Sequence, residues 1–252
     1  MRGVILDIDG VLRRGREVVP GSVEAVEAMM GKGLAICYLT NNSTRSRETM
    51  LSTLTSMGFP EALLVSSAQA AAEYIGEIAG PSRCLVVGEI GLFQELSLAE
   101  HRVVEAGKGD WRADFVVAGL DRDLTYAKVR DSLWAIRDGA RFVATNRDPT
   151  LPQEGGRVVP GAGTTIAAIV ECSGVEPVVV GKPEPYSTLL ALREMGLPAK
   201  DVLMVGDRPD TDIAAGKAAG CQVALVLTGD VGEPETHDYP VYQDLLSLSL
   251  DL

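Results

Sequence analysis

The first ten residues of the chain constrain its fold more than any other stretch. An apolar run over residues 3–6 leads directly into Asp7, Ile8, Asp9 and Gly10. A short apolar run that ends at a turn signal is typical of a strand buried on both faces, as in parallel sheets. Open α/β sheets bind their ligands at the carboxyl ends of such strands. We therefore expect a functional site at the end of this first strand.

The two aspartates of this stretch are themselves informative. Asp7 and Asp9 are two residues apart, so on a regular strand their side chains would share one face. Gly10 lets the chain turn sharply just after them. Two carboxylates this close repel each other unless a positive charge lies near them, and the oxygen ligands suit Mg²⁺. An ordinary acidic turn after a strand would contain the same residues, so this stretch alone leaves both interpretations open.

The charge of the chain limits its partners. The 252 residues include 23 lysines and arginines and 35 aspartates and glutamates, which gives a net charge of −12. This balance argues against nucleic acid and anionic membrane surfaces as partners. A phosphorylated ligand would also be repelled at long range, so a phosphate site here needs local positive charge from a metal, a lysine or backbone amides.

The cysteines and the apolar runs indicate the compartment. Cys37, Cys84, Cys172 and Cys221 are far apart and form no C-x-x-C pair, so we expect buried free thiols in a reducing cytoplasm. The N-terminus enters a strand directly, without the pattern of a signal peptide. No apolar run approaches the roughly 18 residues of a membrane span.

Strand and helix patterns alternate along almost the whole chain, which predicts an α/β protein with a doubly wound parallel sheet. A glycine and a proline mark a boundary near residue 80, and a second alternating pattern begins there. We therefore expect one domain formed by residues 1–79 and 179–252. Residues 80–178 would form a smaller α/β domain inserted between its two parts.

Four polar residues follow the second predicted strand, which spans residues 34–39. They are Thr40, Asn41, Asn42 and Ser43, and a helical pattern begins shortly after them. Backbone N–H groups and a helix amino end converge at such a place, so the stretch has the form of an anion cradle. A helix cap at Asn42 or Ser43 explains part of this composition, but a cap does not need four polar residues.

Two more polar turns follow apolar strands in the second half of the chain. Lys182 is fixed between a glycine and a proline after one strand, and Asp207, Asp210 and Asp212 lie within six residues after another. Most loop lysines are solvated, and a single aspartate would suffice to cap the next helix. Three carboxylates exceed that need and indicate a metal.

In a doubly wound sheet these turns would meet at one edge, because the carboxyl ends of all its strands point there. A cation held by carboxylates, a positive charge and an anion cradle are the parts that phosphoryl transfer needs. The edge would collect Asp7, Asp9, residues 40–43, Lys182, Asp207 and Asp212.

These elements, in this order, resemble the four motifs of the haloacid dehalogenase-like hydrolase superfamily. The inserted domain resembles the C2-type cap of its class IIA branch, the NagD-like, 4-nitrophenylphosphatase and phosphoglycolate phosphatase-like enzymes. Within that domain, residues 118–121 and 144–149 are similar to segments of the phosphatases of the branch. The resemblance implies a Rossmann-like core, an α/β cap and a hydrolase that acts on phosphate esters.

The resemblance also implies roles for the motif residues. Asp7 would be the nucleophile that forms an aspartyl-phosphate, and Asp9 the general acid and then the general base. Mg²⁺ would be held by the carboxylates of Asp7 and Asp207 and by the backbone carbonyl of Asp9. Asp212 would orient a metal-bound water or Lys182.

The resemblance further indicates what holds the substrate, a small phosphorylated metabolite. The candidate residues for recognising this substrate follow a strand of the cap and are Asn146, Arg147 and Asp148. A polar turn before a proline explains these residues equally well. A homodimer formed through the cap is left open. The phosphoryl oxygens would be held by Thr40, Asn41, Asn42 and Lys182.

The leading hypothesis is a Mg²⁺-dependent phosphatase of small monoesters, in the class of phosphoglycolate, glycerol phosphate, nucleoside monophosphates, sugar phosphates or nitrophenyl phosphate. An acid at Asp9 favours phosphate esters as substrates. One alternative is a phosphotransferase such as a mutase, but mutases of the superfamily carry their cap after the first motif. Another is a non-enzymatic phospho-acceptor signalling module, but receiver domains lack both the second acid and a cap.

Overall fold

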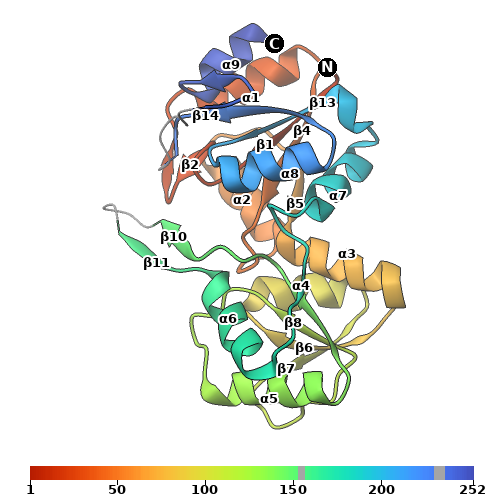
Figure 1. The fold of residues 1–252 in the computed structure, drawn as a ribbon. Helices are drawn as coiled ribbons and strands as arrows, with labels where there is room; N and C mark the ends of the chain where they lie inside the picture. The colour runs from red at the N-terminus through yellow and green to blue at the C-terminus, as the bar shows by residue number, and fades with distance from the viewer. Residues whose placement is uncertain (153–156, 230–235) are drawn as a thin grey trace. The chain divides into compact units, whose positions relative to one another are not determined.

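The computed structural model of the chain describes residues 1–152, 157–229 and 236–252. Its residues divide into two units by their mutual contacts, and each contains one larger parallel sheet. The strands of the first unit come from both ends of the chain, as their red and blue colours show (Figure 1). Unit 1 comprises Met1–Thr40, Glu48–Val65 and Lys182–Leu252, and unit 2 comprises Asn41–Arg47 and Ser66–Gly181.

Unit 1 is built on a six-stranded sheet with β1 in its interior. β1 pairs in parallel with β13 on one side and with β4 on the other, and all five of its residues are buried. This confirms the prediction of a first strand buried on both faces. The strand order is β15 (Val241–Tyr242), β14 (Gln222–Val226), β13 (Val202–Gly206), β1 (Gly3–Asp7), β4 (Ala35–Thr40) and β5 (Leu63–Ser66).

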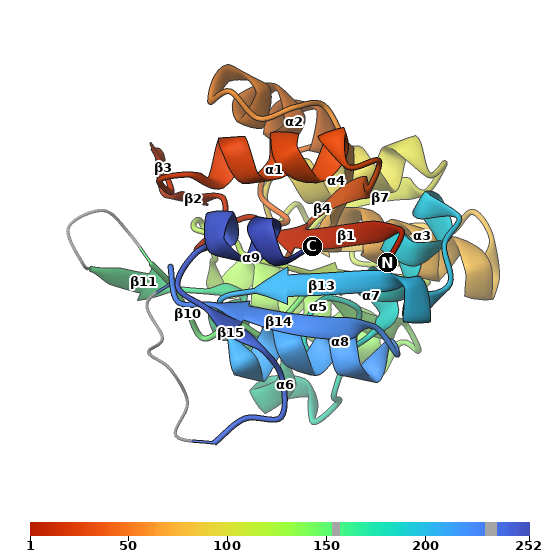
Figure 2. The ribbon, with the colours of Figure 1, turned by 90° about the horizontal axis from the view of Figure 1, so that it is seen from above.

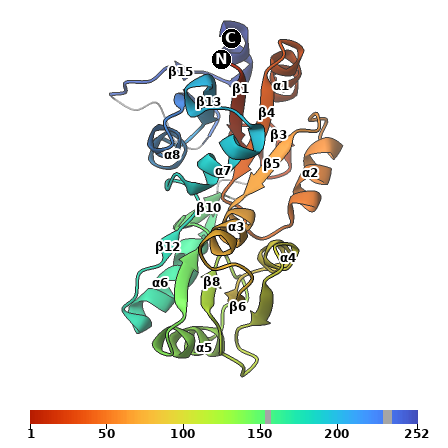
Figure 3. The same cartoon turned by 90° about the vertical axis from the view of Figure 1, so that its right-hand side faces the viewer.

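Helices cover both faces of this sheet. α1 (Ser22–Gly31) and α9 (Leu245–Asp251) lie on one side of β1, β13 and β14, and α8 (Ala214–Ala218) lies on the other (Figure 2). α2 (Arg47–Ser56) shares the side of α1, and α7 (Tyr186–Met195) shares the side of α8 (Figure 3). The predicted doubly wound α/β fold is therefore confirmed.

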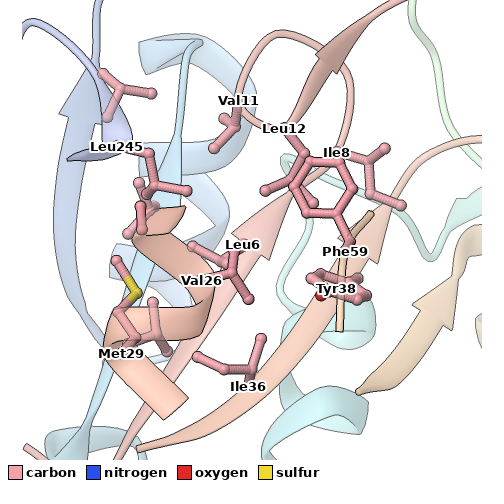
Figure 4. Packing of buried hydrophobic residues seen from close by; sticks show 14 of the residues in the cluster. Leu6, Ile8, Val11, Leu12, Val26, Met29, Ile36, Tyr38, Phe59 and Leu245 are labelled. Carbon is pink, nitrogen blue, oxygen red and sulfur yellow. The ribbon is translucent and has the colours of Figure 1, made fainter. Parts of the chain in front are cut away.

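The core under α1 shows why this arrangement is stable. Val26 and Met29 of α1 are fully buried and lie over Leu6 of β1 and Ile36 of β4, with Leu245 of α9 beside them (Figure 4). Burial of each side chain of this size contributes roughly 1.5–3 kcal/mol. The packing of α1 and α9 on this face buries β1 up to its carboxyl end.

Unit 2 contains a second parallel sheet. α5 (Tyr126–Arg137) and α6 (Ala162–Ser173) cover one face, and α4 (Ile90–Leu98) covers the other (Figure 3). α3 (Ser67–Ala79) packs against α4, and the hydroxyl of Ser66 caps it by accepting from the N–H of Gln69 at 3.1 Å. The strand order is β12 (Val178–Val179), β9 (Arg141–Ala144), β8 (Phe115–Ala118), β6 (Arg83–Val87) and β7 (Arg102–Glu105).

The division into units differs from the expected boundaries at residues 80–178. The helix α3, expected in the first part of the core, groups with unit 2 because it packs against α4, and Asn41–Arg47 groups there as well. A helix pattern in the sequence does not reveal which sheet the helix will contact. That unit 1 is a catalytic core and unit 2 its cap remains a prediction.

Several short strands were not expected from the sequence. β2 (Arg13–Arg14) and β3 (Glu17–Val18) form a hairpin, and β10 (Thr150–Pro152) pairs in the antiparallel sense with β11 (Val158–Pro160). The terminal helix, expected over residues 240–252, begins only at Leu245 because β15 occupies the start of that stretch. Strands of two or three residues are too short to show a period in the sequence.

Two further expectations can be compared with the structure. All four cysteines are free, but only Cys37 and Cys84 are buried as expected, whereas Cys221 is half-buried and Cys172, near the end of α6, is exposed. Among the described residues, no helix combines the length and the apolar character that a membrane crossing needs.

Candidate active site

The carboxyl end of β1 brings a lysine between two aspartates. Asp7 is the last residue of β1 and is buried. The ammonium of Lys182 donates to Oδ1 of Asp7 and, at 2.7 Å, to Oδ1 of Asp212. Lys182 is only 3% exposed, so its charge is balanced by these carboxylates rather than by water.

The turn after β13 supplies the other two carboxylates. The wide π-type turn Pro209–Ile213 folds Asp212 back, so that its Oδ2 accepts from the N–H of Asp207 at 3.2 Å and of Arg208 at 3.0 Å. Asp7, Asp207 and Asp212 each offer an oxygen, and these oxygens all lie within 4.8 Å of one another. Residues about 200 positions apart in sequence thus form one buried carboxylate cluster, which we define as Asp7, Asp207 and Asp212.

The charges of this cluster are not balanced by the protein. Burial, and then the neighbouring Asp212 and Asp207, raise the pKa of Asp7 well above its usual value, although Lys182 acts in the opposite direction. Burial and Asp212 likewise raise the pKa of Asp207 to about 7. Burial by itself would lower the pKa of Lys182, but Asp212 and Asp7 outweigh it and raise that pKa. Three carboxylates around one ammonium thus leave an excess of negative charge.

Three glycines leave room for the carboxylate cluster. The sequence analysis singled out only one of them, Gly10. A Cβ at Gly10 or at Gly229 would collide with the carboxylate of Asp207, and one at Gly206 would collide with Asp212. Gly10 also has a φ of 104°, a backbone angle that residues with a side chain rarely adopt. The signal in the sequence is that two of these glycines, Gly10 and Gly206, lie next to or close to the motif aspartates.

Asp9 lies apart from the carboxylate cluster. β1 ends at Asp7, so the expected sharing of one strand face by the two aspartates does not occur. The Asp9 side chain is 47% exposed, and its Oδ1 pairs with the guanidinium of Arg13 in β2 at 3.0 Å. Backbone bonds from the N–H groups of Leu12 and Arg13 to the carbonyl of Ile8 close the turn that separates Asp9 from the cluster.

The predicted phosphate-holding residues divide between the units. Thr40 is the buried last residue of β4 and belongs with Asp7 to unit 1, whereas Asn41 and Asn42 follow it and belong to unit 2. Oδ1 of Asn42 accepts from both the N–H and the hydroxyl of Thr44, at 2.8 Å each. The side-chain carbonyl of Asn42 therefore stabilises the local turn.

The candidate substrate-reading residues lie in unit 2, after β9. Asn146 is buried, and its Nδ2 donates to the carbonyl of Asn41 at 2.8 Å. Asp148 accepts from Nδ2 of Asn41 at 3.1 Å. Arg147, between them, pairs instead with Glu176. The structure thus brings two of the three candidates onto Asn41.

Known proteins resemble this chain over nearly its whole length. A sequence model described as haloacid dehalogenase-like hydrolase matches residues 4–101, and a second, HAD-hydrolase-like, matches residues 179–250. The 5′-nucleotidase YutF of Bacillus subtilis is 36% identical over 230 residues, which cover 90% of this chain and 88% of the relative. The chain belongs to the haloacid dehalogenase-like hydrolases.

Other relatives place the chain among the phosphatases of this family. The acid sugar phosphatase of Staphylococcus aureus (strain USA300) is 36% identical over 234 residues, 90% of this chain and 87% of the relative. The solved p-nitrophenyl phosphatase from Archaeoglobus fulgidus has a TM-score of 0.91 at 36% identity, covering 100% of this chain and 99% of that one. A solved putative nagD protein has a TM-score of 0.92 at 30% identity, covering 100% and 98%. The predicted class IIA resemblance and the predicted enzyme class, a phosphoric monoester hydrolase, are confirmed.

The carboxylate cluster of this haloacid dehalogenase-like hydrolase fits a divalent cation. Its donors are all oxygens, which hard cations such as Mg²⁺ prefer. A divalent charge would balance the excess negative charge that raises the pKa of Asp7 and Asp207. The bare backbone of Gly10 and Gly229 beside Asp207 keeps side chains out of this space.

Proposed function

We propose that the chain is a Mg²⁺-dependent phosphatase that hydrolyses small phosphate monoesters through an aspartyl-phosphate on Asp7. The observation that carries this proposal is the cluster of three buried carboxylates around one buried lysine at the carboxyl end of β1. A structural role would balance these charges within the protein, whereas a cation would supply the missing positive charge and, together with the lysine, could bind a phosphoryl group.

In the first step, an oxygen of the Asp7 carboxylate attacks the phosphorus of the ester, and the bond from phosphorus to the leaving oxygen breaks. Asp9 gives its proton to the leaving oxygen, so that an alcohol departs. The half-exposed position of Asp9, on the turn just after Asp7, supports this role because it leaves the carboxyl accessible from outside the protein.

In the second step, Asp9 takes a proton from a water molecule whose oxygen attacks the phosphorus. The bond between phosphorus and Asp7 breaks, which releases inorganic phosphate and restores the Asp7 carboxylate. Lys182 contacts Asp7 directly and would neutralise charge that develops on the phosphoryl oxygens in both steps. Asp212 holds that lysine in place through its own hydrogen bond of 2.7 Å.

Mg²⁺ would be held by the carboxylates of Asp7 and Asp207 and by the backbone carbonyl of Asp9. When bound, the ion supplies positive charge that lowers the cost of bringing a phosphate dianion to a carboxylate. Thr40, Asn41 and Asn42, which follow β4 in sequence, would donate to the same phosphoryl oxygens.

The names of the relatives support a small metabolite as the substrate, because they describe a nucleotidase, a sugar phosphatase and nitrophenyl phosphatases. They do not agree on one leaving group, so we propose the shared class, small phosphate monoesters. The four free cysteines are consistent with the cytoplasmic location that we propose for this activity.

The test is release of phosphate by the purified protein from a panel of monoesters, with Mg²⁺ and with a chelator. We expect release that requires the metal and differs among the esters. Retention of a phosphoryl group taken from a small acyl phosphate, without release from any ester, would instead identify a phospho-acceptor module. Transfer to a sugar hydroxyl in preference to water would identify a phosphotransferase.

A further inference from the structure

Asn41 is held at two places by side chains from distant parts of unit 2. Its backbone carbonyl accepts from the hydroxyl of Ser67 at 2.6 Å and from Nδ2 of Asn146 at 2.8 Å. Its side-chain Nδ2 donates to Oδ2 of Asp148 at 3.1 Å. Backbone and side chain of one residue are therefore fixed together.

The turn that follows β9 is itself braced for this contact. Oδ1 of Asn146 accepts from the N–H of Asp148 at 3.1 Å, so one amide side chain holds both Asp148 and Asn41. Asn146 and Ser67 are buried, which makes the loss of these hydrogen bonds costly. A carboxylate only accepts hydrogen bonds, so Asp148 requires the NH₂ side of Asn41 to face it. The orientation of the whole Asn41 amide is thereby set.

The same turn also restricts which residue can stand at position 181, just before Lys182. A Cβ at Gly181 would lie 2.6 Å from Oδ1 of Asn41 and would collide with the carbonyl oxygen of Thr145. Only glycine fits between these groups. Gly181, which precedes Lys182, and Asn41, which follows Thr40, therefore both contact residues 145–148.

We propose that Asn146 and Asp148 are positioning residues that hold Asn41 in the orientation needed to bind the phosphoryl group, and that they do not read the leaving group. This inference rests on the proposed function, in which Asn41 donates to the phosphoryl oxygens. It replaces the earlier hypothesis that these two residues contact the variable part of the substrate.

Mutation of a positioning residue and mutation of a residue that recognises the leaving group should affect different sets of ligands. Every ester and the product share the phosphoryl group, so a residue that acts through Asn41 affects all of them by one factor. A residue that reads the leaving group affects some esters more than others and leaves the affinity for inorganic phosphate unchanged.

The experiment compares Asn146→Ala, Asp148→Ala and Asp148→Asn with the wild-type protein. It measures kcat and KM for a nitrophenyl, a sugar and a nucleoside phosphate, and the dissociation constant of inorganic phosphate by calorimetry. We expect Asn146→Ala and Asp148→Ala to raise KM for all three esters, and the phosphate dissociation constant, by a common factor of about ten. Asp148→Asn retains a side-chain oxygen for Nδ2 of Asn41 and should restore near wild-type values.

Asp138→Ala is the matched control, because Asp138 also accepts a side-chain N–H within unit 2, from Trp111 at 3.0 Å. It should leave all these constants unchanged. Thermal unfolding of each variant checks that unit 2 is folded, and Ser67→Ala tests the same carbonyl of Asn41 from a second side if Asn146→Ala fails to fold. We expect Ser67→Ala to weaken phosphate binding as well.

A KM change confined to one ester, with phosphate affinity unchanged, would overturn the inference and return Asn146 and Asp148 to substrate reading. Equal damage by Asp148→Asn and Asp148→Ala would also overturn it. Failure of the proposed function gives a different result, since wild-type protein would then release no phosphate from any ester. Calorimetry with inorganic phosphate would still decide the inference in that case.

Discussion

Lys182 in unit 1 and Lys128 in unit 2 both donate to a buried aspartate, but the charges around them differ. Lys128 pairs with Asp121 at 2.7 Å, and the second oxygen of Asp121 accepts from the N–H of Asp123 at 2.9 Å. Lys182 instead faces two aspartates, and the third aspartate of the cluster lies close to both. Unit 2 therefore balances this buried charge one to one, whereas unit 1 carries an excess of negative charge.

The difference teaches how to separate structural charges from functional ones. A balanced buried pair is satisfied by the protein alone, and removing one partner leaves the other uncompensated. An unbalanced cluster is satisfied only when a ligand arrives, and it makes the folded protein less stable until then. Asp121 and Asp7 thus have opposite expected responses to neutralisation, although both are buried beside a lysine.

The largest expected effect is that of Asp7→Asn. We expect phosphate release to fall by about 10⁴-fold or more, because the amide cannot form the acyl phosphate. We also expect the metal-free variant to unfold at the same or a higher temperature than the wild type, because burial and neighbouring carboxylates disfavour the charged form of Asp7. Phosphate release assays and thermal unfolding in chelator measure the two effects. A variant that retained a tenth of the activity would refute Asp7 as the nucleophile.

Asp9→Asn tests whether a balanced pair can also be catalytic, since Asp9 is paired with Arg13. We expect rates on esters with poor leaving groups to fall by about 10²- to 10³-fold, because these groups need a proton as they depart. A nitrophenyl ester, whose leaving group is stable as an anion, should lose far less in the first step. Steady-state kinetics on an alkyl and a nitrophenyl ester give the comparison, and equal losses on both would exclude a general acid at Asp9.

Asp121→Asn is the matched change in unit 2. We expect it to lower the free energy of unfolding by about 3 kcal/mol, because Lys128 would lose its buried partner. Activity per folded molecule should stay the same, since Asp121 belongs to no predicted site. Denaturant unfolding, followed with activity at a permissive temperature, measures both. An unchanged stability would show that this pair is not balanced as its geometry indicates.

The sequence allowed the motif residues to be located but not all of their contacts. Asp7 and Asp207 could be placed together because β1 and β13 are parallel neighbours, whose carboxyl ends meet at one edge. That argument does not hold for Lys182, because the strand before it, β12, belongs to the sheet of unit 2. The position of Asp9 could not be predicted, because it depends on where β1 ends and on the two-residue strand that carries Arg13. The catalytic roles of the motif residues remain predictions.

The contacts made by glycines and by the turn after β9 were beyond a sequence reading for a similar reason. Gly229 matters because Asp207 lies against it, and Asn146 matters because it reaches Asn41, more than 100 residues away. Neither contact leaves a local pattern, since each exists only after the sheets have formed. The fold class could be predicted because alternation of strands and helices is local, whereas the assignment of α3 to unit 2 depends on its packing against α4.

The smallest expected effect is stabilisation by the metal, and it tests the comparison most directly. Mg²⁺ at a hundred times its dissociation constant should raise the free energy of unfolding by about 2.7 kcal/mol, which thermal unfolding would detect as a shift of several degrees. Asp207→Asn should lose most of this shift because it removes a carboxylate of the cluster, whereas Asp121→Asn should keep it. The net charge of −12 makes general screening by Mg²⁺ the competing explanation, and screening would stabilise the wild type and Asp207→Asn equally. A shift confined to proteins with the intact cluster would show that the unbalanced charge of unit 1 is a cation site.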